Sequence, residues 1–431
     1  MTDTIFALAT PPGRGAIAII RLSGPGTDAA LAGLGAPGLT ARLASLRTLR
    51  HAGEVLDQAL VLRFPGPNSY TGEDCAEMHL HGGRAVIDAV STALIALGLR
   101  PAEPGEFTRR AFENGRMDLA QAEAVADLID AETTAQASQA LGQLEGALSR
   151  TYEGFRRDLL TALALVEAEI DFPDEELPDH LAQTAGPVLD RLIGDLTAAL
   201  ADADRGRRVR EGYRIVLIGE TNAGKSALFN ALVEREAAIV TPIAGTTRDV
   251  LDAELVIGGY AVTLSDTAGL RESDDVVEAE GIRRARARAE GADLRLWVRA
   301  PGDPEGAAAE FAQPEDFVIW TKADLAPAGG EGIVVSALSG AGMAALHDAL
   351  ADRLARDLSG ADFPAVTRER HRRRLTEALA AAETGQARLS DAPELAGDDL
   401  RRAADALSRV SGAIGVEDVL GEVFSTFCIG K

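Results

Sequence analysis

The stretch YRIVLIGETNAGKS, residues 213–226, decides how the middle of this 431-residue chain folds. Its apolar run, residues 215–218, has the composition of a buried strand. The pattern G-x-x-x-x-G-K-S begins directly afterwards at Gly219, and leucine and phenylalanine then recur at helical spacing. A strand, a glycine-rich loop and a helix in this order predict a phosphate-binding loop, the P-loop.

The predicted P-loop brings the groups that a nucleoside triphosphate and its metal ion need. Successive backbone N–H groups surround the phosphates, Lys225 reaches the β- and γ-phosphates, and the Ser226 hydroxyl binds Mg²⁺. Lys225 is therefore also a predicted catalytic residue. The predicted nucleotide-binding residues of this loop are Asn222, Ala223, Gly224, Lys225, Ser226 and Ala227.

Two further motifs follow along the chain. Thr247 lies in the segment TPIAGTTRD, where its hydroxyl is expected to bind Mg²⁺. Asp266 opens DTAG at the end of a predicted strand, and its carboxylate is expected to hold Mg²⁺ through a water molecule. Asp266 is thus a second predicted catalytic residue. The N–H of Gly269 is expected to meet the γ-phosphate.

The next two motifs predict that the base is guanine. The segment TKAD begins at Thr321, and Asp324 can accept hydrogen bonds from N1 and N2 of guanine, which adenine cannot supply. The stem of Lys322 would lie across the plane of the base. Ser336 and Ala337 end another predicted strand and would lend a backbone N–H to guanine O6. Four motifs in this order predict a Ras-like P-loop G domain.

Two positions depart from the common GTPase pattern. Thr321 stands where asparagine is usual, and a hydroxyl cannot make all the hydrogen bonds of an amide, so weaker base binding with retained guanine selectivity is expected. Leu270 stands where Ras-like proteins carry the glutamine that orients the attacking water. Either hydrolysis is negligible or another group orients the water, and candidates lie in the acidic stretch 272–280.

Composition limits the classes of function. The formal net charge is -24, which opposes nonspecific binding of nucleic acid over the whole surface. No run of about 18 apolar residues predicts a membrane span, and the two cysteines lie far apart in the sequence. A cytoplasmic protein that binds neither membrane nor DNA is expected. The 43 basic residues include only three lysines, Lys225, Lys322 and Lys431, and the first two lie in nucleotide motifs.

The hydrophobic pattern divides the chain into four predicted parts. Residues 1–117 are predicted to be a mixed α/β domain, and residues 118–211 and 357–431 to be helical. Residues 212–356 alternate strands with helices, which predicts a largely parallel sheet. The predicted strands are 16–22, 59–64, 75–80, 214–218, 252–257, 261–265, 293–298, 316–320 and 332–335, and the predicted helices include 84–98, 370–389 and 399–414.

Three local patterns add detail. Apolar residues between positions 141 and 170 fall on one helical stripe and predict a single long helix. The basic cluster 205–210 is interpreted as a solvated linker. In one predicted strand Arg295, Trp297 and Arg299 share a face, which is unusual for an interior parallel strand.

Several motifs lie outside the predicted G domain. They include ATPPGRGAIAIIRLSG near the start, FPGPNSYTGED, RPAEPGEFTRRAFENGRMDLAQAEAVADLIDA, DFPDEE and the terminal FCIGK. With EREAAIVTPIAGTTRDV and DTAGLRES, these motifs resemble the bacterial tRNA-modification GTPase family MnmE (TrmE) over essentially the full length of the chain. The resemblance is therefore to this family and not to GTPases in general.

The resemblance implies a fold and a reaction. An N-terminal folate-binding domain that forms a homodimer precedes a helical domain made from two separated segments, with the G domain inserted between them. With MnmG, a partner that carries FAD, the family modifies C5 of the wobble uridine of certain tRNAs. A carboxymethylaminomethyl or aminomethyl group is attached, and the one-carbon unit comes from a tetrahydrofolate derivative, 5-formyl- or methylene-tetrahydrofolate.

The resemblance also implies potassium-dependent hydrolysis. K⁺ takes the place at which an arginine finger otherwise neutralises charge in the transition state. The K⁺ ligands that carry over are Asn222, Thr241, Ile243 and Thr246, of which Thr241 and Thr246 also count among the nucleotide contacts. The acid that positions water carries over to Glu278, the third predicted catalytic residue.

The family's folate site carries over to Arg21, Glu77, Arg116 and Lys431. Glu77 can accept hydrogen bonds from the amino and N–H donors of a pterin, and the basic groups suit carboxylate and formyl oxygens. Arg116 stands where lysine is usual, so its contacts are expected to differ in geometry.

Two other functions stay open on the sequence alone. A ribosome-assembly or regulatory GTPase would bind RNA directly, but it would need a basic module that the sequence does not display. A folate-binding scaffold with a vestigial G domain would not need Lys225, Ser226, Asp266 and Asp324, all of which are present.

Overall fold

The computed structural model describes residues 3–171, 180–236, 252–266, 287–303, 313–327, 329–360, 363–364 and 366–412, with residues 424, 427 and 430. The chain divides into two compact units. Unit 1 comprises residues 1–126, 152–156 and 401–431, and unit 2 comprises residues 127–151 and 157–400. No helix among the described residues is long and apolar enough to cross a membrane. The finer division into four parts stays a prediction.

Unit 1 contains a six-stranded sheet with the order β3-β4-β5-β2-β1-β6. Its strands are β1 (Ile5–Leu8), β2 (Ile17–Ser23), β3 (Ser45–His51), β4 (Glu54–Phe64), β5 (Cys75–His81) and β6 (Arg100–Pro101). The three strands predicted here are confirmed as β2, β4 and β5. Strands β1, β3 and β6 were not predicted, because β1 and β6 are short and β3 (SLRTLRH) is mostly polar.

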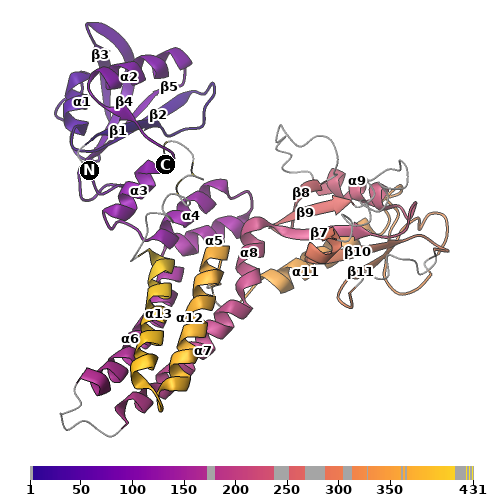
Figure 1. The fold of residues 1–431 in the computed structure, drawn as a ribbon. Coiled ribbons are helices and arrows are strands. Elements are labelled where there is room, and N and C mark those ends of the chain that lie inside the picture. The colour runs from indigo at the N-terminus through magenta and orange to yellow at the C-terminus, as the bar shows by residue number, and fades with distance from the viewer. Residues whose placement is uncertain are drawn as a thin grey trace, which may run out of the picture. The chain divides into compact units, whose positions relative to one another are not determined.

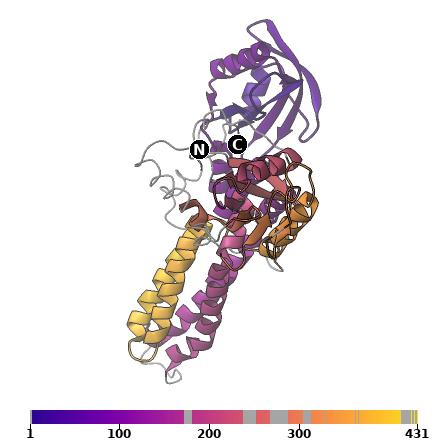
Figure 2. The same cartoon turned by 90° about the vertical axis from the view of Figure 1, so that its right-hand side faces the viewer.

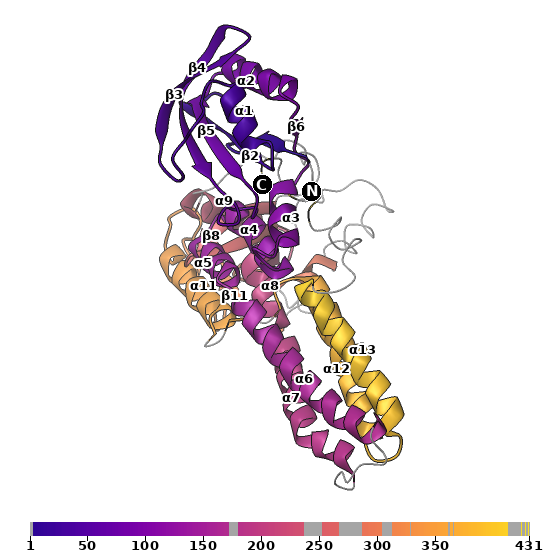
Figure 3. The same ribbon diagram turned by 90° about the vertical axis from the view of Figure 1, so that its left-hand side faces the viewer.

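Alternation along these strands separates the two faces of the sheet. Helices α1 (Thr27–Gly33) and α2 (Arg84–Ala96) cover one face of this sheet (Figure 3). Buried residues of β2, β4 and β5 form one hydrophobic cluster with residues of these two helices. The other face carries apolar side chains that stay exposed, among them Ile17, Leu46 and Leu60. Leu46 lies opposite Leu60 in the strand register, so two of these three side chains are direct cross-strand neighbours.

A buried ionic cluster lies beside this sheet. The guanidinium of Arg110, on α3 (Glu106–Glu113), is fully buried and donates to Glu106 at 3.2 Å and to Glu73 at 3.0 Å. Arg100 of β6 also donates to Glu106, with Nη1 at 2.9 Å from Oε2. Asp3 accepts from both arginines, at 2.6 Å from Arg100 Nε and 2.9 Å from Arg110 Nη2. Arg110 and Glu106 are fully buried, whereas Arg100 and Asp3 are partly exposed. Together these ion pairs connect β6 and the segment just before β1 to α3.

Unit 2 does not contain the single helix predicted over residues 141–170. The chain forms α5 (Thr134–Leu144), breaks, and starts again as α6 (Ala147–Asp171). Gly146 in the break has φ +84°, a conformation that glycine adopts at little cost. Leu141, assigned to the apolar stripe, is 46% exposed. The prediction was wrong because apolar spacing continued in phase across a glycine that ends the helix.

The basic cluster 205–210 is not a solvated linker. It forms the helix α8 (Ala203–Glu211), and its arginines are held by specific partners. Arg208 Nε donates to Asp293 at 2.7 Å, and Arg210 Nε donates to the carbonyl of Thr367 at 2.9 Å. The charges therefore anchor α8 to its neighbours in unit 2.

Other helices of the chain are α4 (Leu119–Asp130), α7 (Gly186–Ala201), α12 (Glu369–Arg388) and α13 (Pro393–Ser411), with the 3₁₀ turn η1 (Leu181–Ala185). Helices α7 and α12 lie side by side (Figures 1 and 2). The helix predicted over residues 370–389 is confirmed within one residue at each end. The next begins at Pro393, six residues before its predicted start, where proline suits the first turn.

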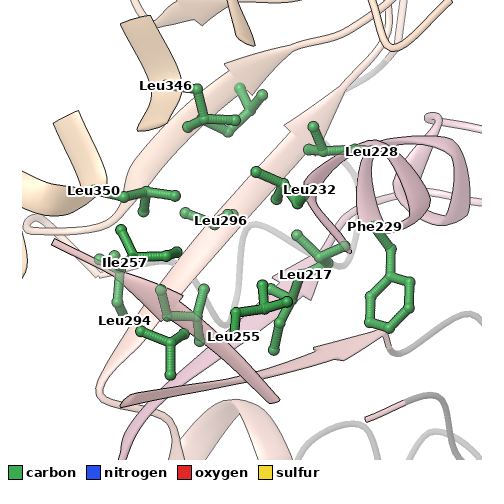
Figure 4. Packing of buried hydrophobic residues seen from close by; sticks show 14 of the residues in the cluster. Leu217, Leu228, Phe229, Leu232, Leu255, Ile257, Leu294, Leu296, Leu346 and Leu350 are labelled. Carbon is green, nitrogen blue, oxygen red and sulfur yellow. The ribbon is translucent and has the colours of Figure 1, made fainter. Parts of the chain in front are cut away.

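The predicted parallel sheet of unit 2 is confirmed. Its order is β12-β11-β10-β7-β9-β8, and all neighbours are parallel except the hairpin of β8 and β9. The strands are β7 (Tyr213–Ile218), β8 (Asp252–Ile257), β9 (Tyr260–Asp266), β10 (Leu294–Arg299), β11 (Phe317–Trp320) and β12 (Ile333–Val334). Helices α9 (Lys225–Glu236) and α11 (Met343–Leu358) cover one face, where leucines of both helices and of the strands form the core shown in Figure 4.

The ionic cluster of unit 1 makes a testable contribution to stability. Replacing Glu106 by Gln should lower the free energy of unfolding of unit 1 by about 3 kcal/mol at pH 7, because the buried Arg110 loses one of its three carboxylate partners and Arg100 loses one of its two. Burial alone would raise the pKa of Glu106, but hydrogen bonds, chiefly from Arg100, lower it below its ordinary value of 4.5. The contribution is therefore present above pH 4.5 and is lost as the pH falls through the lowered pKa of the folded state.

Urea unfolding followed by circular dichroism at pH 7 and at pH 3.5 measures this difference. The control is Glu113→Gln on the same helix, where a partly exposed carboxylate lies 3.6 Å from Arg109, and its effect should stay below about 0.5 kcal/mol. An equally large effect of Glu106→Gln at both pH values would contradict the assignment.

Candidate functional site

The candidate site lies where parallel strands of unit 2 end. Strands β7, β9, β10 and β11 run in one direction, so their carboxyl ends share one edge of the sheet. The P-loop follows β7, Asp266 is the last residue of β9, and Thr321 comes directly after β11. The fold therefore brings together at one edge three motifs that are spread over about 100 residues of sequence.

Backbone geometry explains the residues at the start and in the middle of the P-loop. A Cβ on Gly219, which has φ +148°, would lie 2.2 Å from the carbonyl oxygen of Val298, so only glycine fits. Asn222 has φ +63°, a left-handed conformation that asparagine adopts more readily than most residues. The loop thus starts against β10 and turns back toward α9.

Lys225 lies buried at the first position of α9. Its Nζ donates to the carbonyl oxygens of Gly219 at 2.7 Å and Glu220 at 2.9 Å. Burial lowers the pKa of Lys225, and nearby carboxylates, Asp266 foremost, act in the opposite direction. The ammonium is therefore already held inside the loop, where a phosphate chain would meet it.

Ser226 and Asp266 form the predicted metal-binding pair. The Ser226 hydroxyl donates to Asp266 Oδ2 at 2.8 Å, and the Asp266 side chain is buried. A hydroxyl and a carboxylate oxygen, both hard donors, fit Mg²⁺, which also retains waters and binds phosphate oxygens. The third predicted group, Thr247, lies outside the described residues.

The base-recognition residues also come together. The Ser336 hydroxyl donates to Asp324 Oδ1 at 2.6 Å. The backbone N–H of Ser336 donates to the carbonyl of Ala341 at 2.9 Å, so of the two predicted N–H donors to guanine O6 the one of Ser336 is already bonded within the protein. Lys322, with φ +56°, places its Nζ 2.8 Å from the carbonyl oxygen of Asn222 in the P-loop. The bond from the Ser336 side chain was not predicted, although a serine hydroxyl at this position can donate a hydrogen bond and was visible in the sequence.

Two of the predicted folate residues meet on the sheet of unit 1. Arg21 on β2 lies opposite Glu77 on β5, and Arg21 Nε donates to Glu77 Oε1 at 3.0 Å. The Arg21 guanidinium also lies over the rings of Tyr70 and Phe107, with its Cζ 5.3 and 5.8 Å from their centroids. Arg116 is exposed after α3, and no contact between it and this pair is among those described.

Seven predicted site residues, and also Leu270, lie outside the described residues. Gly430, which is described, precedes Lys431 and lies close to Leu8, because a Cβ on Gly430 would be 2.3 Å from the Leu8 carbonyl oxygen. Of the predicted K⁺ ligands, Asn222 alone falls within the described residues. The predicted residues outside them are Thr241, Ile243, Thr246, Thr247, Gly269, Leu270, Glu278 and Lys431.

The bond between Ser336 and Asp324 predicts a role in base recognition. Ser336→Ala should raise the Kd for GDP roughly tenfold, because the Asp324 carboxylate loses a hydrogen bond that orients it. Titration with a fluorescent GDP analogue measures the change. Ser339→Ala, in the same loop but with an exposed side chain, is the control and should bind like the wild type. Equal affinities of the Ser336→Ala variant and the wild type would contradict this role.

Comparison with known proteins agrees with both units. A family profile described as the N-terminus of the GTP-binding protein TrmE matches residues 4–116, and one described as the MnmE helical domain matches residues 119–428. Proteins named tRNA modification GTPase MnmE are similar over 100% of both chains. They come from Caulobacter vibrioides (56% identity over 451 residues), Phenylobacterium zucineum (53% over 448) and Maricaulis maris (52% over 447). The chain therefore belongs to the MnmE (TrmE) family.

Proposed function

We propose that this protein is a K⁺-dependent GTP hydrolase that acts, with MnmG, in the modification of C5 of the wobble uridine of certain tRNAs in the cytoplasm. The observation that carries the proposal is the joint placement of Lys225, Ser226 and Asp266 at one sheet edge. These groups serve phosphate binding and Mg²⁺, and the family's relatives bear the name tRNA modification GTPase MnmE. A vestigial G domain would have no need of a buried lysine whose charge must be held by loop carbonyls.

Phosphate binding follows from the P-loop. Lys225 reaches the β- and γ-phosphates. Its ammonium already lies in the loop, where it donates to the carbonyl oxygens of Gly219 and Glu220. The Ser226 hydroxyl and, through water, Asp266 would hold Mg²⁺ together with Thr247, and the Gly269 N–H would meet the γ-phosphate. Because Lys225, Ser226 and Asp266 are already held by hydrogen bonds at the sheet edge, little movement of these three side chains is needed to stabilise the charge that develops on the phosphate.

Guanine selectivity rests on Asp324. Its carboxylate, oriented by Ser336, accepts from N1 and N2 of guanine, while Ala337 donates to O6 and the stem of Lys322 covers the base. Adenine offers an acceptor at N1 and no amino group at C2, so it would leave the Asp324 carboxylate without these two donors.

Hydrolysis needs a group to position water, since Leu270 cannot do so. We assign this task to Glu278, and we assign K⁺ to a site formed by Asn222, Thr241, Ile243 and Thr246 next to the phosphates. K⁺ supplies positive charge at the transferring phosphate, as an arginine finger does in other GTPases. Asn222 supports this assignment because it lies within the phosphate-binding loop, where its backbone is left-handed with φ +63°.

The folate site is proposed at Arg21, Glu77, Arg116 and Lys431. The ligand would be a tetrahydrofolate derivative, 5-formyl- or methylene-tetrahydrofolate, that supplies a one-carbon unit. Arg21 and Glu77 support the proposal, because their ion pair lies on the open face of the sheet with about a quarter of each side chain exposed. The other carboxylate oxygen, Glu77 Oε2, lies 3.7 Å from His79 Nε2 and could also accept from a pterin. Gly430, the residue before Lys431, lies near the end of β1.

We also propose that the protein forms a homodimer and works with the FAD protein MnmG on tRNA. The exposed apolar side chains of Ile17, Leu46 and Leu60 support a second copy on the open face of the unit 1 sheet. The net charge of -24 supports binding of tRNA through the complex and not by this chain alone.

The GTPase assignment predicts a separation between binding and turnover. GTP hydrolysis should be at least several-fold faster in K⁺ than in Na⁺. The variant Glu278→Ala should lower kcat by about a hundredfold and should change the Kd for GTP little. A phosphate-release assay in each salt, with nucleotide titrations alongside, measures both quantities. Glu280→Ala, two residues further on, is the control and should hydrolyse GTP like the wild type. Wild-type kcat in Glu278→Ala would refute its role, and equal, negligible rates in both salts would favour the folate-binding scaffold.

The folate assignment predicts a selective loss of ligand binding. Glu77→Gln should raise the Kd for 5-formyl-tetrahydrofolate about tenfold, because the charged acceptor and its pair with Arg21 are both lost. Calorimetric titration of the full-length protein measures this. Glu54→Gln, an exposed position on β4, is the control. Unchanged binding by Glu77→Gln would remove Glu77 from the site.

A further inference from the structure

The polar face of β10, unusual for an interior strand, has two separate structural explanations. Arg295 is buried and paired, with Nε 2.8 Å from Asp316 Oδ2. Arg299 instead stacks between the only two tryptophans of the chain: its Cζ lies 4.9 Å from the ring centroid of Trp297 and 4.7 Å from that of Trp320. Both cation–π contacts lie at the end of the sheet that carries the nucleotide site.

Trp320 supports the segment that leads to Ser336. Its ring is buried, and its Nε1 donates to the carbonyl of Glu331 at 3.1 Å. A Cβ on Gly329 would lie 2.7 Å from the Trp320 ring, so the chain passes directly over the indole. This chain leads through β12 to Ser336, whose hydroxyl orients Asp324. The indole therefore holds one of the two base-recognition segments.

Thr321, the residue after Trp320, connects the other base-recognition segment to the P-loop. Its side chain is 4% exposed, and its Oγ1 lies 2.5 Å from the carbonyl oxygen of Ala223 and 3.1 Å from that of Arg299. Its backbone N–H donates to the same Arg299 carbonyl at 2.8 Å. The hydroxyl is therefore directed at the backbone of the phosphate loop and of β10, with both acceptors on the protein.

We propose that Arg299, Trp320 and Thr321 form a clasp that positions the base-recognition segments against the P-loop, and that Thr321 acts through this clasp and not by contact with the base. The proposal rests on the GTP site proposed above and assigns three positioning residues to it. A hydroxyl is shorter than the asparagine amide usual at this position, yet it reaches Ala223 because Gly224 leaves room beside it: a Cβ on Gly224 would be 3.1 Å from Thr321 Oγ1.

The physical effect of the clasp is pre-organisation. Asp324 and Ala337 recognise guanine only if their segments keep a fixed distance from the loop that holds the phosphates. Without the clasp, part of the binding free energy would be spent on ordering these segments, and affinity would fall without a change in which base is preferred. A contact of Thr321 with the 2-amino group of guanine would instead change the preference between GDP and inosine diphosphate.

The experiment compares GDP with inosine diphosphate, which lacks the 2-amino group of guanine. Thr321→Val keeps the shape of the side chain and removes the hydroxyl, Thr321→Ser keeps the hydroxyl, and Arg299→Met removes both cation–π contacts. Thr263→Val on β9 is the matched control, and Asp324→Ala is the control for lost base recognition. Kd values for both nucleotides and the thermal midpoint without nucleotide are measured for each full-length variant.

The clasp predicts that Thr321→Val raises the Kd for GDP about tenfold and Arg299→Met roughly fivefold. The Kd for inosine diphosphate divided by the Kd for GDP should stay at its wild-type value in both variants. In Asp324→Ala this ratio should fall, because the 2-amino group of guanine is no longer recognised. Thr321→Ser and Thr263→Val should bind like the wild type, and the thermal midpoints should stay within about 2 °C.

Wild-type affinity in Thr321→Val would overturn the proposal, and so would a changed nucleotide ratio, which would mean a base contact. Equal losses in Thr321→Val and Thr321→Ser would overturn the role of the hydroxyl. Failure of the wild-type protein to bind GDP at all would overturn the proposed function itself, so the two failures are distinguishable.

Discussion

The shared edge at which β7, β9, β10 and β11 end is the constraint on which the candidate site depends. Parallel pairing in this register places the P-loop, Asp266 and Thr321 next to one another although they are far apart in sequence. Gly219 approaches the Val298 carbonyl so closely that a Cβ at position 219 would lie 2.2 Å from its oxygen, so no other residue fits there. The positions of the P-loop, of the Ser226–Asp266 pair and of the segment that begins at Thr321 then follow from where these strands end.

Much of this arrangement could be predicted from the sequence, because local signals were strong. Apolar runs ended by glycine or aspartate marked the strands, and the P-loop pattern located the helix that follows β7. The long helix was predicted wrongly because the apolar spacing continues across Gly146. The positive φ of this glycine ends the helix, and hydrophobic periodicity contains no information about it. The arginines of α8 looked like a linker because their partners, such as Asp293, are supplied by tertiary contacts.

The site was predicted as a set of residues but not as a network. Motif spacing indicates which groups face the nucleotide, whereas the bonds among protein groups depend on the packing of segments distant in sequence. Ser336 orients Asp324, and Thr321 bonds to Ala223, about 100 residues away. Arg299 departs from the pattern of an interior strand, and its contacts with the indoles of Trp297 and of Trp320 in the next strand explain this. Residues that hold a site together are less visible in sequence than residues that touch a ligand.

We propose that the G domain of this protein serves tRNA modification through its nucleotide chemistry. Mass spectrometry of the wobble uridine, in tRNA from a strain that lacks this gene, tests it most directly. The account predicts that the C5 modification disappears, returns with the wild-type gene, and does not return with a gene carrying Asp266→Ala, which removes the buried partner of Ser226. Full modification without the gene, or full restoration by the Asp266→Ala variant, would contradict the account.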